Sequence, residues 1–418
     1  MLKQIEGSRG VAEAVALCRP EVICAYPITP QTHIVEDLGS QVKGGQLINC
    51  EFINVESEFA ALSVGIGSSA AGARTYTATA RQGLLYMAEA VYNASGLGLP
   101  IVMTVGNRAI GSPINIWNDQ SDSMSMRDAG WIQLFAETNQ QAIDVHIQAF
   151  KIAEALSMPV MVCVDGFILT HAYERMDVPD QDQVDRFLPP FEPRQVLDPS
   201  EPISIGAMVG PEAFTEVRYM EHHKQLQALE IIPEINKEFK EIFGRDSGGL
   251  ISTYRADDAD TLIVTLGSVI GTISEVIDEM RDKGQKIGAV TIRSFRPFPL
   301  DEIHEVLKKT QRVVVFEKCL AVGLGGIVAS NVRMAHRGLT TPVYTVIGGL
   351  GGRPITRKSL NELFEKAMTD DLEETTFLDL KQDVVNHEID RGEKFTRPGA
   401  IAENVLRQIG VVDVAKTS

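Results

Sequence analysis

Short apolar runs alternate with amphipathic stretches over most of the first half of the chain. The runs that predict strands cover residues 21–26, 47–53, 74–79, 99–106 and 158–164. The stretches that predict helices cover residues 30–44, 56–73, 82–95 and 139–156. The strand runs are short and continuously apolar, as buried strands are, and the helical stretches repeat their apolar positions at helical spacing. This alternation predicts an α/β fold, in which a parallel sheet carries helices on both faces.

A proline-rich segment separates this block from a second one. Prolines recur among acidic residues over 175–211, which predicts a crossing segment, and a polar helix is expected near 219–243. Strand runs then return at 261–266, 286–292, 312–317 and 342–347, with helical stretches at 271–283, 299–309, 325–337 and 356–368. We therefore expect a first domain over residues 1–245, a smaller α/β domain over 246–368, and an acidic tail over 369–418 that packs on a partner.

Length and charge narrow the class of protein. The 418 residues allow two or three domains, each with its own hydrophobic core. The formal net charge of −17 argues against nucleic acid and against an anionic membrane, because both require a basic surface. No basic segment leads into an apolar leader and no apolar run has the length of a membrane span, so we expect a cytoplasmic protein.

Cysteine and histidine give no metal or cluster signal. Cys18, Cys24, Cys50, Cys163 and Cys319 occur singly, without a CxxC pair, so we expect buried hydrophobes and no iron–sulfur cluster of the usual kind in this chain. No HExxH sequence or Asp/His pairing indicates a metal, and we expect no metal ligands.

The turn AYPITPQT (25–32) is the first candidate for chemistry. It follows a strand and leads into a helix, with Pro30 expected at the first helical position and Thr29 as the N-cap. A helix N-terminus presents unpaired N–H groups, so a carboxylate lying over Thr29 would be bound by the backbone and the hydroxyl together. The alternative is that Thr29 only caps its own helix.

Other candidates follow the next three strands, because ligands of parallel sheets bind beyond the carboxyl ends of the strands. Glu56 and Glu58 follow the second strand, Arg81-Gln82-Gly83 follow the third, and Arg108 follows the fourth. The alternative for the glutamates is a favourable charge at a helix N-terminus.

Arg108 closes an apolar strand and precedes a long polar loop. Its guanidinium suits a bidentate contact with a carboxylate. The alternative is a structural ion pair with Asp119 or Asp122. The length of the loop favours a functional segment over a plain connection.

Motifs in both blocks resemble one family. The first block holds YPITPQT (26–32), VESE (55–58), ARQGLL (80–85), NRAIGSPINIWNDQSDS (107–123) and DGFILTH (165–171). The second holds TLGSVIGT (265–272), IRSFRPFP (292–299), VVVFEK (313–318) and GGLGGR (348–353). In this order and spacing they resemble the α subunit of a multi-subunit pyruvate:ferredoxin oxidoreductase, over nearly the whole chain. The resemblance implies a thiamine-diphosphate-binding pyrimidine-type domain followed by a transketolase C-terminal-type domain.

The resemblance also implies roles for individual residues. Glu58 matches the glutamate that bonds N1′ of the thiamine diphosphate aminopyrimidine, where a held proton favours the reactive imino form. Ile28, Gln82 and Gly83 would line the aminopyrimidine pocket. Thr29 and Arg108 match the residues that bind the carboxylate and carbonyl of the 2-oxoacid.

Partners are implied as well. The chain has no GDG motif followed by an Asn pair, so a β subunit would supply Mg²⁺ and the diphosphate half of the cofactor site. Since cysteine clusters are also missing here, 4Fe–4S clusters would lie on β and on a ferredoxin-like δ subunit. A γ subunit, coenzyme A as co-substrate, and ferredoxin as electron acceptor complete the implied assembly, a dimer of hetero-oligomers. The chain alone should be inactive.

Several alternatives stay open. Arg81 stands where the family usually has a smaller residue, which keeps 2-oxoglutarate open as a substrate, and branched 2-oxoacids are less favoured. A component of a lipoate-linked 2-oxoacid dehydrogenase is a rival that the YPITP turn opposes. A non-catalytic nucleotide-binding subunit is another, with GLGG (323–326) as a phosphate loop, although Val328 stands at the third glycine of GxGxxG.

Overall fold

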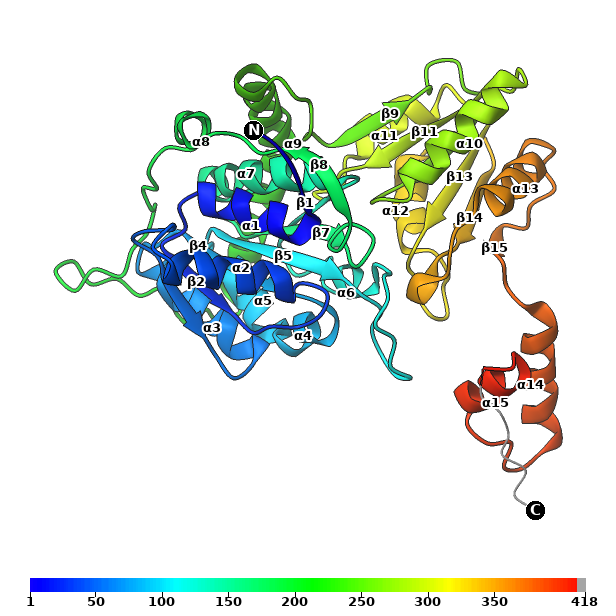
Figure 1. Ribbon diagram of the computed structural model, residues 1–418, viewed down its shortest axis with the longest axis horizontal. Coiled ribbons are helices and arrows are strands. Elements are labelled where there is room, and N and C mark those ends of the chain that lie inside the picture. The colour runs from blue at the N-terminus through cyan, green and yellow to red at the C-terminus, as the bar shows by residue number, and fades with distance from the viewer. Residues whose placement is uncertain (412–418) are drawn as a thin grey trace.

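Two sheets with their covering helices make up most of the molecule in the computed structural model, which describes residues 1–411 (Figure 1). Most of the first sheet lies among the elements coloured blue to green, and the second sheet lies among those coloured green to orange. A small antiparallel pair, β1 (Leu2–Glu6) with β8 (Tyr173–Asp177), completes the strands of the first half.

The first sheet has seven strands in the order β12-β6-β7-β5-β4-β2-β3. Its strands are β2 (Val22–Ala25), β3 (Glu51–Asn54), β4 (Thr75–Thr79), β5 (Ile101–Asn107), β6 (Ile132–Phe135), β7 (Val160–Asp165) and β12 (Ser294–Arg296). All neighbours pair in parallel except β12, which runs antiparallel to β6 and comes from the second half of the chain. The carboxyl ends of the parallel strands therefore share one edge.

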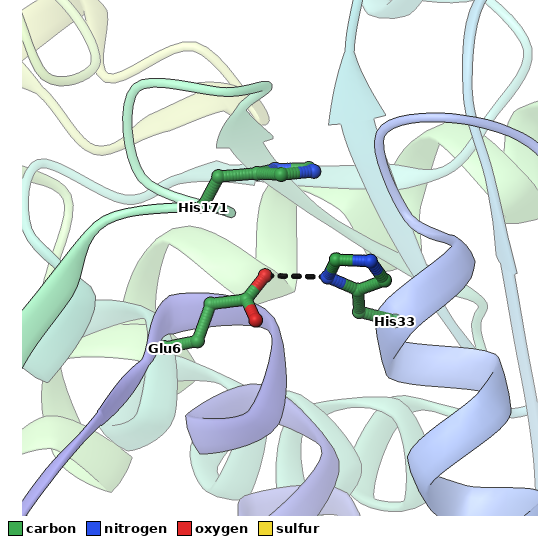
Figure 2. A group of neighbouring side chains, drawn as sticks. All are labelled: Glu6, His33 and His171. Atoms are coloured by element: carbon green, nitrogen blue, oxygen red, sulfur yellow. Dashed lines mark hydrogen bonds and ion pairs between the residues drawn. The ribbon is translucent and has the colours of Figure 1, made fainter.

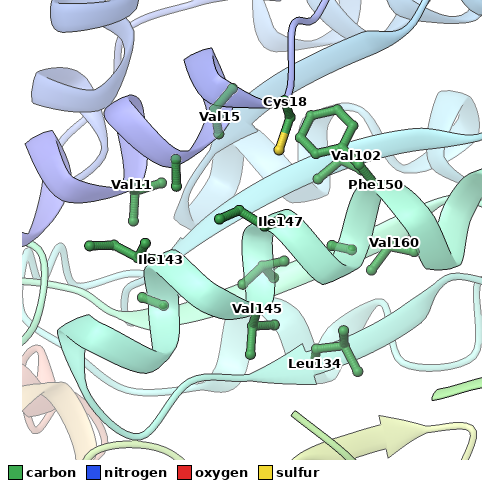
Figure 3. Close-up of a cluster of buried hydrophobic side chains, with 14 of the residues drawn as sticks. Val11, Val15, Cys18, Val102, Leu134, Ile143, Val145, Ile147, Phe150 and Val160 are labelled. Carbon is green, nitrogen blue, oxygen red and sulfur yellow. The ribbon is translucent and has the colours of Figure 1, made fainter. Parts of the chain in front are cut away.

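Helices cover both faces of this sheet, as predicted. One face carries α1 (Gly7–Leu17), α2 (Thr32–Lys43) and α7 (Asn139–Leu156), and the other α3 (Glu58–Ala70), α4 (Arg81–Tyr86) and α5 (Ala88–Gly96). Figure 3 shows Val15 of α1 and Ile147 of α7 in the cluster that also holds Val102 of β5 and Val160 of β7. This packing fixes the strand ends that carry the candidate residues.

The segment after β7 is partly ordered into helices. Two helices follow β8, namely α8 (Gln181–Phe187) and the long α9 (Phe214–Phe243), which begins five residues before the predicted polar helix. Between them the chain has little regular structure, in agreement with its prolines.

The second sheet has six strands in the order β15-β14-β13-β10-β11-β9. They are β9 (Ile251–Tyr254), β10 (Thr261–Thr265), β11 (Ile287–Ile292), β13 (Arg312–Glu317), β14 (Val343–Ile347) and β15 (Thr375–Phe377), all parallel except β9. Its helices are α10 (Ile270–Asp282), α11 (Leu300–Leu307), α12 (Ile327–Ala335) and α13 (Arg357–Met368). Every strand and helix predicted for this block is present.

The expected tail departs from the prediction at its start. Residues 375–377 form β15, which pairs with β14, so the second sheet extends beyond the boundary predicted at residue 368. The next residues form α14 (Gln382–Lys394) and α15 (Ile401–Gln408), a hairpin that lies apart from both sheets (Figure 1). Residues 412–418 of the predicted tail lie outside the described residues. Within residues 1–411, no helix combines the length and apolar character needed to cross a membrane.

Candidate active site

The predicted site residues follow four neighbouring strands of the first sheet. Thr29 follows β2, Glu58 follows β3, Arg81 to Gly83 follow β4, and Arg108 follows β5. These strands are adjacent in the order β5-β4-β2-β3. Since parallel strands end at one edge, the structure brings these segments to one side of the sheet.

Glu58 and Gly83 are in direct contact. Glu58 is the first residue of α3, after the N-cap Ser57, whose side chain accepts the N–H of Ala60. Its side chain is buried, and a Cβ added to Gly83 would lie 2.7 Å from Glu58 Oε1. Only a residue without a side chain fits there, so the ARQGLL glycine is explained by the position of the carboxyl group.

Unpaired polar atoms surround this contact. Among residues 1–411, no hydrogen bond joins the Glu58 carboxyl to another residue, and the side-chain oxygens Gln82 Oε1 and Thr79 Oγ1 are buried without partners. Buried polar groups are normally satisfied, so a polar ligand is expected here. The Glu58 carboxyl and the Gln82 amide lie beside Gly83, which has no side chain to block a ligand. These groups match the donors and acceptors of an aminopyrimidine ring, so the residues fit thiamine diphosphate, the cofactor that the motifs implied.

Thr29 is not a helix cap, which corrects the sequence prediction. Helix α2 begins at Thr32 with Gln31 as N-cap, and Thr29 and Pro30 lie in a turn closed by the bond from Gln31 N–H to the Ile28 carbonyl, 3.0 Å. Buried Gln31 also donates its side-chain amide to the Tyr26 carbonyl, 2.9 Å, which anchors the turn. Thr29 is therefore exposed ahead of the helix rather than bound to it, with Ile28 half-buried beside it.

Arg108 is held by main-chain carbonyls. Its Nη1 donates to the Thr29 carbonyl over 2.9 Å, and its Nε donates to the Asn115 carbonyl over 3.2 Å. The alternative of an ion pair with Asp119 or Asp122 is absent from the salt bridges of the described residues. Burial and the neighbouring Arg81 lower the pKa of Arg108, and Asp122 opposes them. A bound anion would relieve this positive charge.

Asp122, which the sequence offered only as an ion-pair partner of Arg108, instead holds the backbone of two site residues. Its Oδ2 accepts the backbone N–H groups of both Arg81, 2.9 Å, and Arg108, 3.0 Å, and its Oδ1 accepts the amide of Asn107. Burial raises the pKa of Asp122 to about 7, although these N–H donors favour the ionised form. The signal in the sequence was weak, because Asp122 lies in a loop fourteen residues beyond Arg108.

Arg81 faces this loop. It has a positive φ of 53°, and its guanidinium donates to the carbonyls of Ala109, 3.0 Å, and Gly111, 3.1 Å. Gln82 donates to the same Gly111 carbonyl over 3.2 Å. The Arg81 guanidinium therefore fixes the start of the loop through these hydrogen bonds. This role explains an arginine at this position without a dianionic substrate.

The side chains of Glu6, His33 and His171 form a second group of titratable residues (Figure 2). Glu6 Oε1 lies 2.6 Å from Nδ1 of His33, and the His171 ring lies 5.0 Å from the His33 ring. Sequence spacing gave no sign of this group, which is close enough to be compared with a metal site. Two ligand atoms around one zinc ion lie roughly 3.3 Å apart. The distance of 2.6 Å between Glu6 and His33 is too short for two ligands of one zinc ion, so this contact is a hydrogen bond. It joins α2 to the start of α1.

The GLGG segment does not present a free phosphate loop. It precedes α12, whose first N–H groups donate to the buried Glu317 carboxylate: Ile327 over 2.7 Å and Val328 over 2.8 Å. A third bond comes from Ala329, 3.1 Å. Because a carboxylate of the chain already satisfies these donors, the nucleotide-binding alternative loses its main support.

Family comparisons agree with the motifs. A family model described as pyruvate flavodoxin/ferredoxin oxidoreductase, thiamine diphosphate-binding, matches residues 13–237. A second, described as pyruvate:ferredoxin oxidoreductase core domain II, matches residues 259–360. Both matches fall on the two blocks predicted from the sequence.

Curated relatives cover nearly the whole chain. The pyruvate synthase subunit PorA of Methanosarcina barkeri is 45% identical, over 91% of this chain and 97% of its own length. The subunit of the same name from Methanothermobacter thermautotrophicus is 43% identical, over 92% and 99%. A ketoisovalerate oxidoreductase subunit VorA of Pyrococcus horikoshii is 39% identical, over 87% and 93%.

Solved structures show the same fold at low identity. A 2-oxoglutarate:ferredoxin oxidoreductase from Magnetococcus marinus superposes with a TM-score of 0.69 at 20% identity, over 88% of this chain and 65% of that one. A split-gene transketolase superposes with a TM-score of 0.53 at 14% identity, over 88% and 99%. The α/β fold and the family resemblance predicted from the sequence are thereby confirmed. The chain belongs to the pyruvate flavodoxin/ferredoxin oxidoreductase family, and its first domain is of the thiamine diphosphate-binding type.

Proposed function

We propose that this chain is the α subunit of a pyruvate:ferredoxin oxidoreductase. The assembled enzyme carries out coenzyme A-dependent oxidative decarboxylation of pyruvate to acetyl-CoA and CO2, with electrons passed to ferredoxin. The relatives named pyruvate synthase subunit support pyruvate as the substrate, at 43–45% identity. The observation that carries the proposal is the buried Glu58 carboxyl, which lies against Gly83 without a partner among the described residues.

Glu58 would hold a proton at N1′ of the aminopyrimidine, with Gln82, Gly83 and Ile28 lining the ring. Thiamine diphosphate, when bound, would supply the nucleophilic carbon that the reaction of a 2-oxoacid requires. A buried carboxyl suits this task, because the site around it would be shielded from water when the ring is bound.

Thr29 and Arg108 would bind the substrate. The guanidinium uses Nη1 and Nε on carbonyls, and no hydrogen bond of its Nη2 is found within residues 1–411. That nitrogen and the exposed Thr29 hydroxyl can hold the carboxylate and carbonyl of a 2-oxoacid. Burial, and secondly the neighbouring Arg81, lower the pKa of Arg108, and a substrate carboxylate would offset both effects.

The remaining parts of the reaction are assigned to partners. A β subunit would provide Mg²⁺ and the diphosphate site, with 4Fe–4S clusters on β and δ and a γ subunit completing a dimer of hetero-oligomers in the cytoplasm. The single cysteines support this division: Cys18, Cys24, Cys163 and Cys319 are buried, and Cys50 is half-buried. The α14–α15 hairpin would pack on a partner, since Phe395 and Ile401 are exposed on it.

Two other substrates deserve a direct test. The VorA relative supports a branched 2-oxoacid, at lower identity than the pyruvate synthase subunits. For 2-oxoglutarate the sequence argument was Arg81, whose guanidinium is bonded within the chain.

The test is coenzyme A-dependent viologen reduction by the complex purified without oxygen. Pyruvate, 2-oxoglutarate and 2-ketoisovalerate are compared, and lipoyl-domain reduction is measured in parallel. We expect reduction of viologen with pyruvate and its loss in a complex that carries Glu58→Gln. Transfer to the lipoyl domain, or full turnover by the Glu58→Gln complex, would refute the proposal.

A further inference from the structure

Three motifs of the second domain converge on the loop that carries Arg108. This loop, residues 107–123, is called the Arg108 loop below. Ser268 belongs to TLGSVIGT, Lys318 ends VVVFEK, and Gly351 belongs to GGLGGR. The proposed chemistry uses none of them, yet all three contact the Arg108 loop or its support at the end of β7.

Lys318 is the centre of these contacts. Its ammonium group lies 3.4 Å from Asp165 at the end of β7, and the two side chains are only 3% and 1% exposed. The same ammonium donates to the side-chain carbonyl of Asn118 in the Arg108 loop. Asp165 also accepts the N–H of Ser268 over 3.0 Å. Burial raises the pKa of Asp165, but Lys318 and the hydrogen bonds from Ser268 and Gln120 lower it more, so the pKa lies below its usual value.

Asn118 connects Lys318 to the end of strand β5, which directly precedes Arg108. Its side-chain amide donates to the main-chain carbonyl of Asn107 over 3.2 Å and to Asp165 Oδ1 over 3.2 Å. Asn107 directly precedes Arg108. A single buried amide therefore joins Lys318 of the second domain to the backbone next to the arginine.

Further bonds hold the loop along its length. The N–H of Gln120 donates to the Lys318 carbonyl over 2.9 Å, and Asn115 donates to the Gly351 carbonyl over 3.1 Å. The N–H of Gly351 donates to Asp119 over 3.1 Å. The Asn115 carbonyl is the group that receives Nε of Arg108. The second domain thus fixes Asn115, whose carbonyl accepts a hydrogen bond from the Arg108 guanidinium, as well as the backbone of Asn107 just before Arg108.

The loop needs such support. Its one helix, α6 (Ser121–Ser125), has five residues, and Ile114 and Trp117 are exposed. A loop without its own core keeps one conformation only if its bonds to other elements fix it. A buried ion pair is in general a poor source of stability but a strict geometric constraint, because losing one partner leaves a buried charge.

We propose that Lys318 is a positioning residue for the substrate site, which acts through Asn118 to hold the Arg108 guanidinium in its binding geometry. The second domain would then take part in substrate recognition without touching the substrate. This inference rests on the proposed role of Arg108 as the ligand of the substrate carboxylate.

The test uses the assembled complex with Lys318→Met or Asn118→Ala in this chain. For each variant we expect the KM for pyruvate to rise about tenfold or more while the KM for coenzyme A stays within about twofold, since a displacement of about 1 Å is costly in an oriented site. The double variant should be no worse than the more affected single variant, because the two residues act in one path. Asn118→Ala leaves both charges paired, so it reports on geometry even if Lys318→Met lowers stability.

Arg74→Met is the matched control. Arg74 is 5% exposed and forms an ion pair of 2.6 Å with Glu154, which is 15% exposed, just before β4 at the opposite edge of the sheet. It should lower the melting temperature without raising the KM for pyruvate.

The outcomes separate this inference from the proposed function. If Arg108→Gln raises the KM for pyruvate but Lys318→Met and Asn118→Ala do not, the positioning role is refuted and the proposed function stands. Independent effects that add in the double variant would also refute it. If Arg108→Gln itself leaves the KM unchanged, the proposed substrate site is refuted instead.

Discussion

The α-carbon of Gly83 faces the Glu58 carboxyl so closely that an added methyl group would lie 2.7 Å from Oε1 and 2.8 Å from Cγ. The backbone of Glu58 is fixed because it is the first residue of helix α3. Gly83 and Glu58 therefore form one structural unit of the site, although they lie 25 residues apart in the sequence.

Gly83→Ala should displace the Glu58 carboxyl and lower turnover of the complex by about a hundredfold, because an acid misplaced by about 1 Å no longer meets the ring nitrogen. Thiamine diphosphate affinity, measured by titration of the cofactor-free complex, should fall as well. Gly271→Ala is the control, since nothing lies within 4 Å of its added Cβ. Normal turnover by the Gly83→Ala complex would contradict the assigned contact.

Asp122→Asn should weaken the hydrogen bonds by which Asp122 holds the backbone of Arg81 and Arg108 together. The amide NH2 replaces one of two oxygens that each accept N–H groups, so it faces either the backbone donors of Arg81 and Arg108 or the side-chain amide of Asn107. We expect a loss of about 1–3 kcal/mol in the free energy of unfolding, measured by urea denaturation, and a lower kcat/KM for pyruvate. Asp257→Asn, at an exposed side chain of the second half of the chain, should change neither quantity. Unaltered kcat/KM in the Asp122→Asn complex would count against the organising role.

His146 predicts how stability depends on pH. It is fully buried on α7, bonded to Thr104 Oγ1 and to the Ala142 carbonyl, and burial lowers its pKa from 6.5 to about 4. Below pH 6.5 the unfolded chain binds a proton that the folded chain does not, so stability falls as the pH falls from about 6.5 to about 4, by about 3 kcal/mol in all.

Urea denaturation between pH 4.5 and 7.5 measures this slope. His146→Gln should flatten it, because glutamine does not titrate, whereas His387→Gln at an exposed position of α14 should leave it unchanged. An equally steep curve for His146→Gln would show that other groups control the acid limb.

Glu317→Gln should destabilise the second domain. The carboxylate accepts three N–H groups at the start of α12, and an amide can accept at only one of its two atoms. We expect a loss of about 1–3 kcal/mol in the free energy of unfolding, seen as a lower urea midpoint. The exposed Glu365 provides the control variant, Glu365→Gln. An unchanged midpoint would mean that the helix start does not depend on this carboxylate.

The periodic parts of the fold were predictable from the sequence because burial dictates their pattern. Helix α7 spans the predicted residues 139–156, and each predicted strand overlaps a strand of the structure. Missed elements were short or weakly patterned: β6 has four residues, and α1 begins with Gly7 and includes Gly10. The helix predicted over 82–95 is divided at Met87 into α4 and α5.

The site was predictable only in part. The edge of the sheet and the positions after each strand followed from topology, so Glu58, Gly83 and Arg108 could be named. Thr29 was placed correctly in the chain but wrongly as a helix cap, because the capping preference of threonine gives no information about where the turn ends. Asp122 was named only as a possible ion-pair partner of Arg108, since the sequence does not show that it accepts backbone N–H groups. Lys318 and Asp165 lie 153 residues apart, and a single sequence carries no signal for such a contact.

Strand β12 belongs to the second half of the chain but extends the first sheet at β6, with Ser294 opposite Leu134 and Arg296 opposite Gln133. Without it, the outer backbone groups of β6 would be open to pair with another chain, a common cause of aggregation. A shortened form of the protein that ends before residue 294 would therefore be expected to self-associate even if its own core were complete.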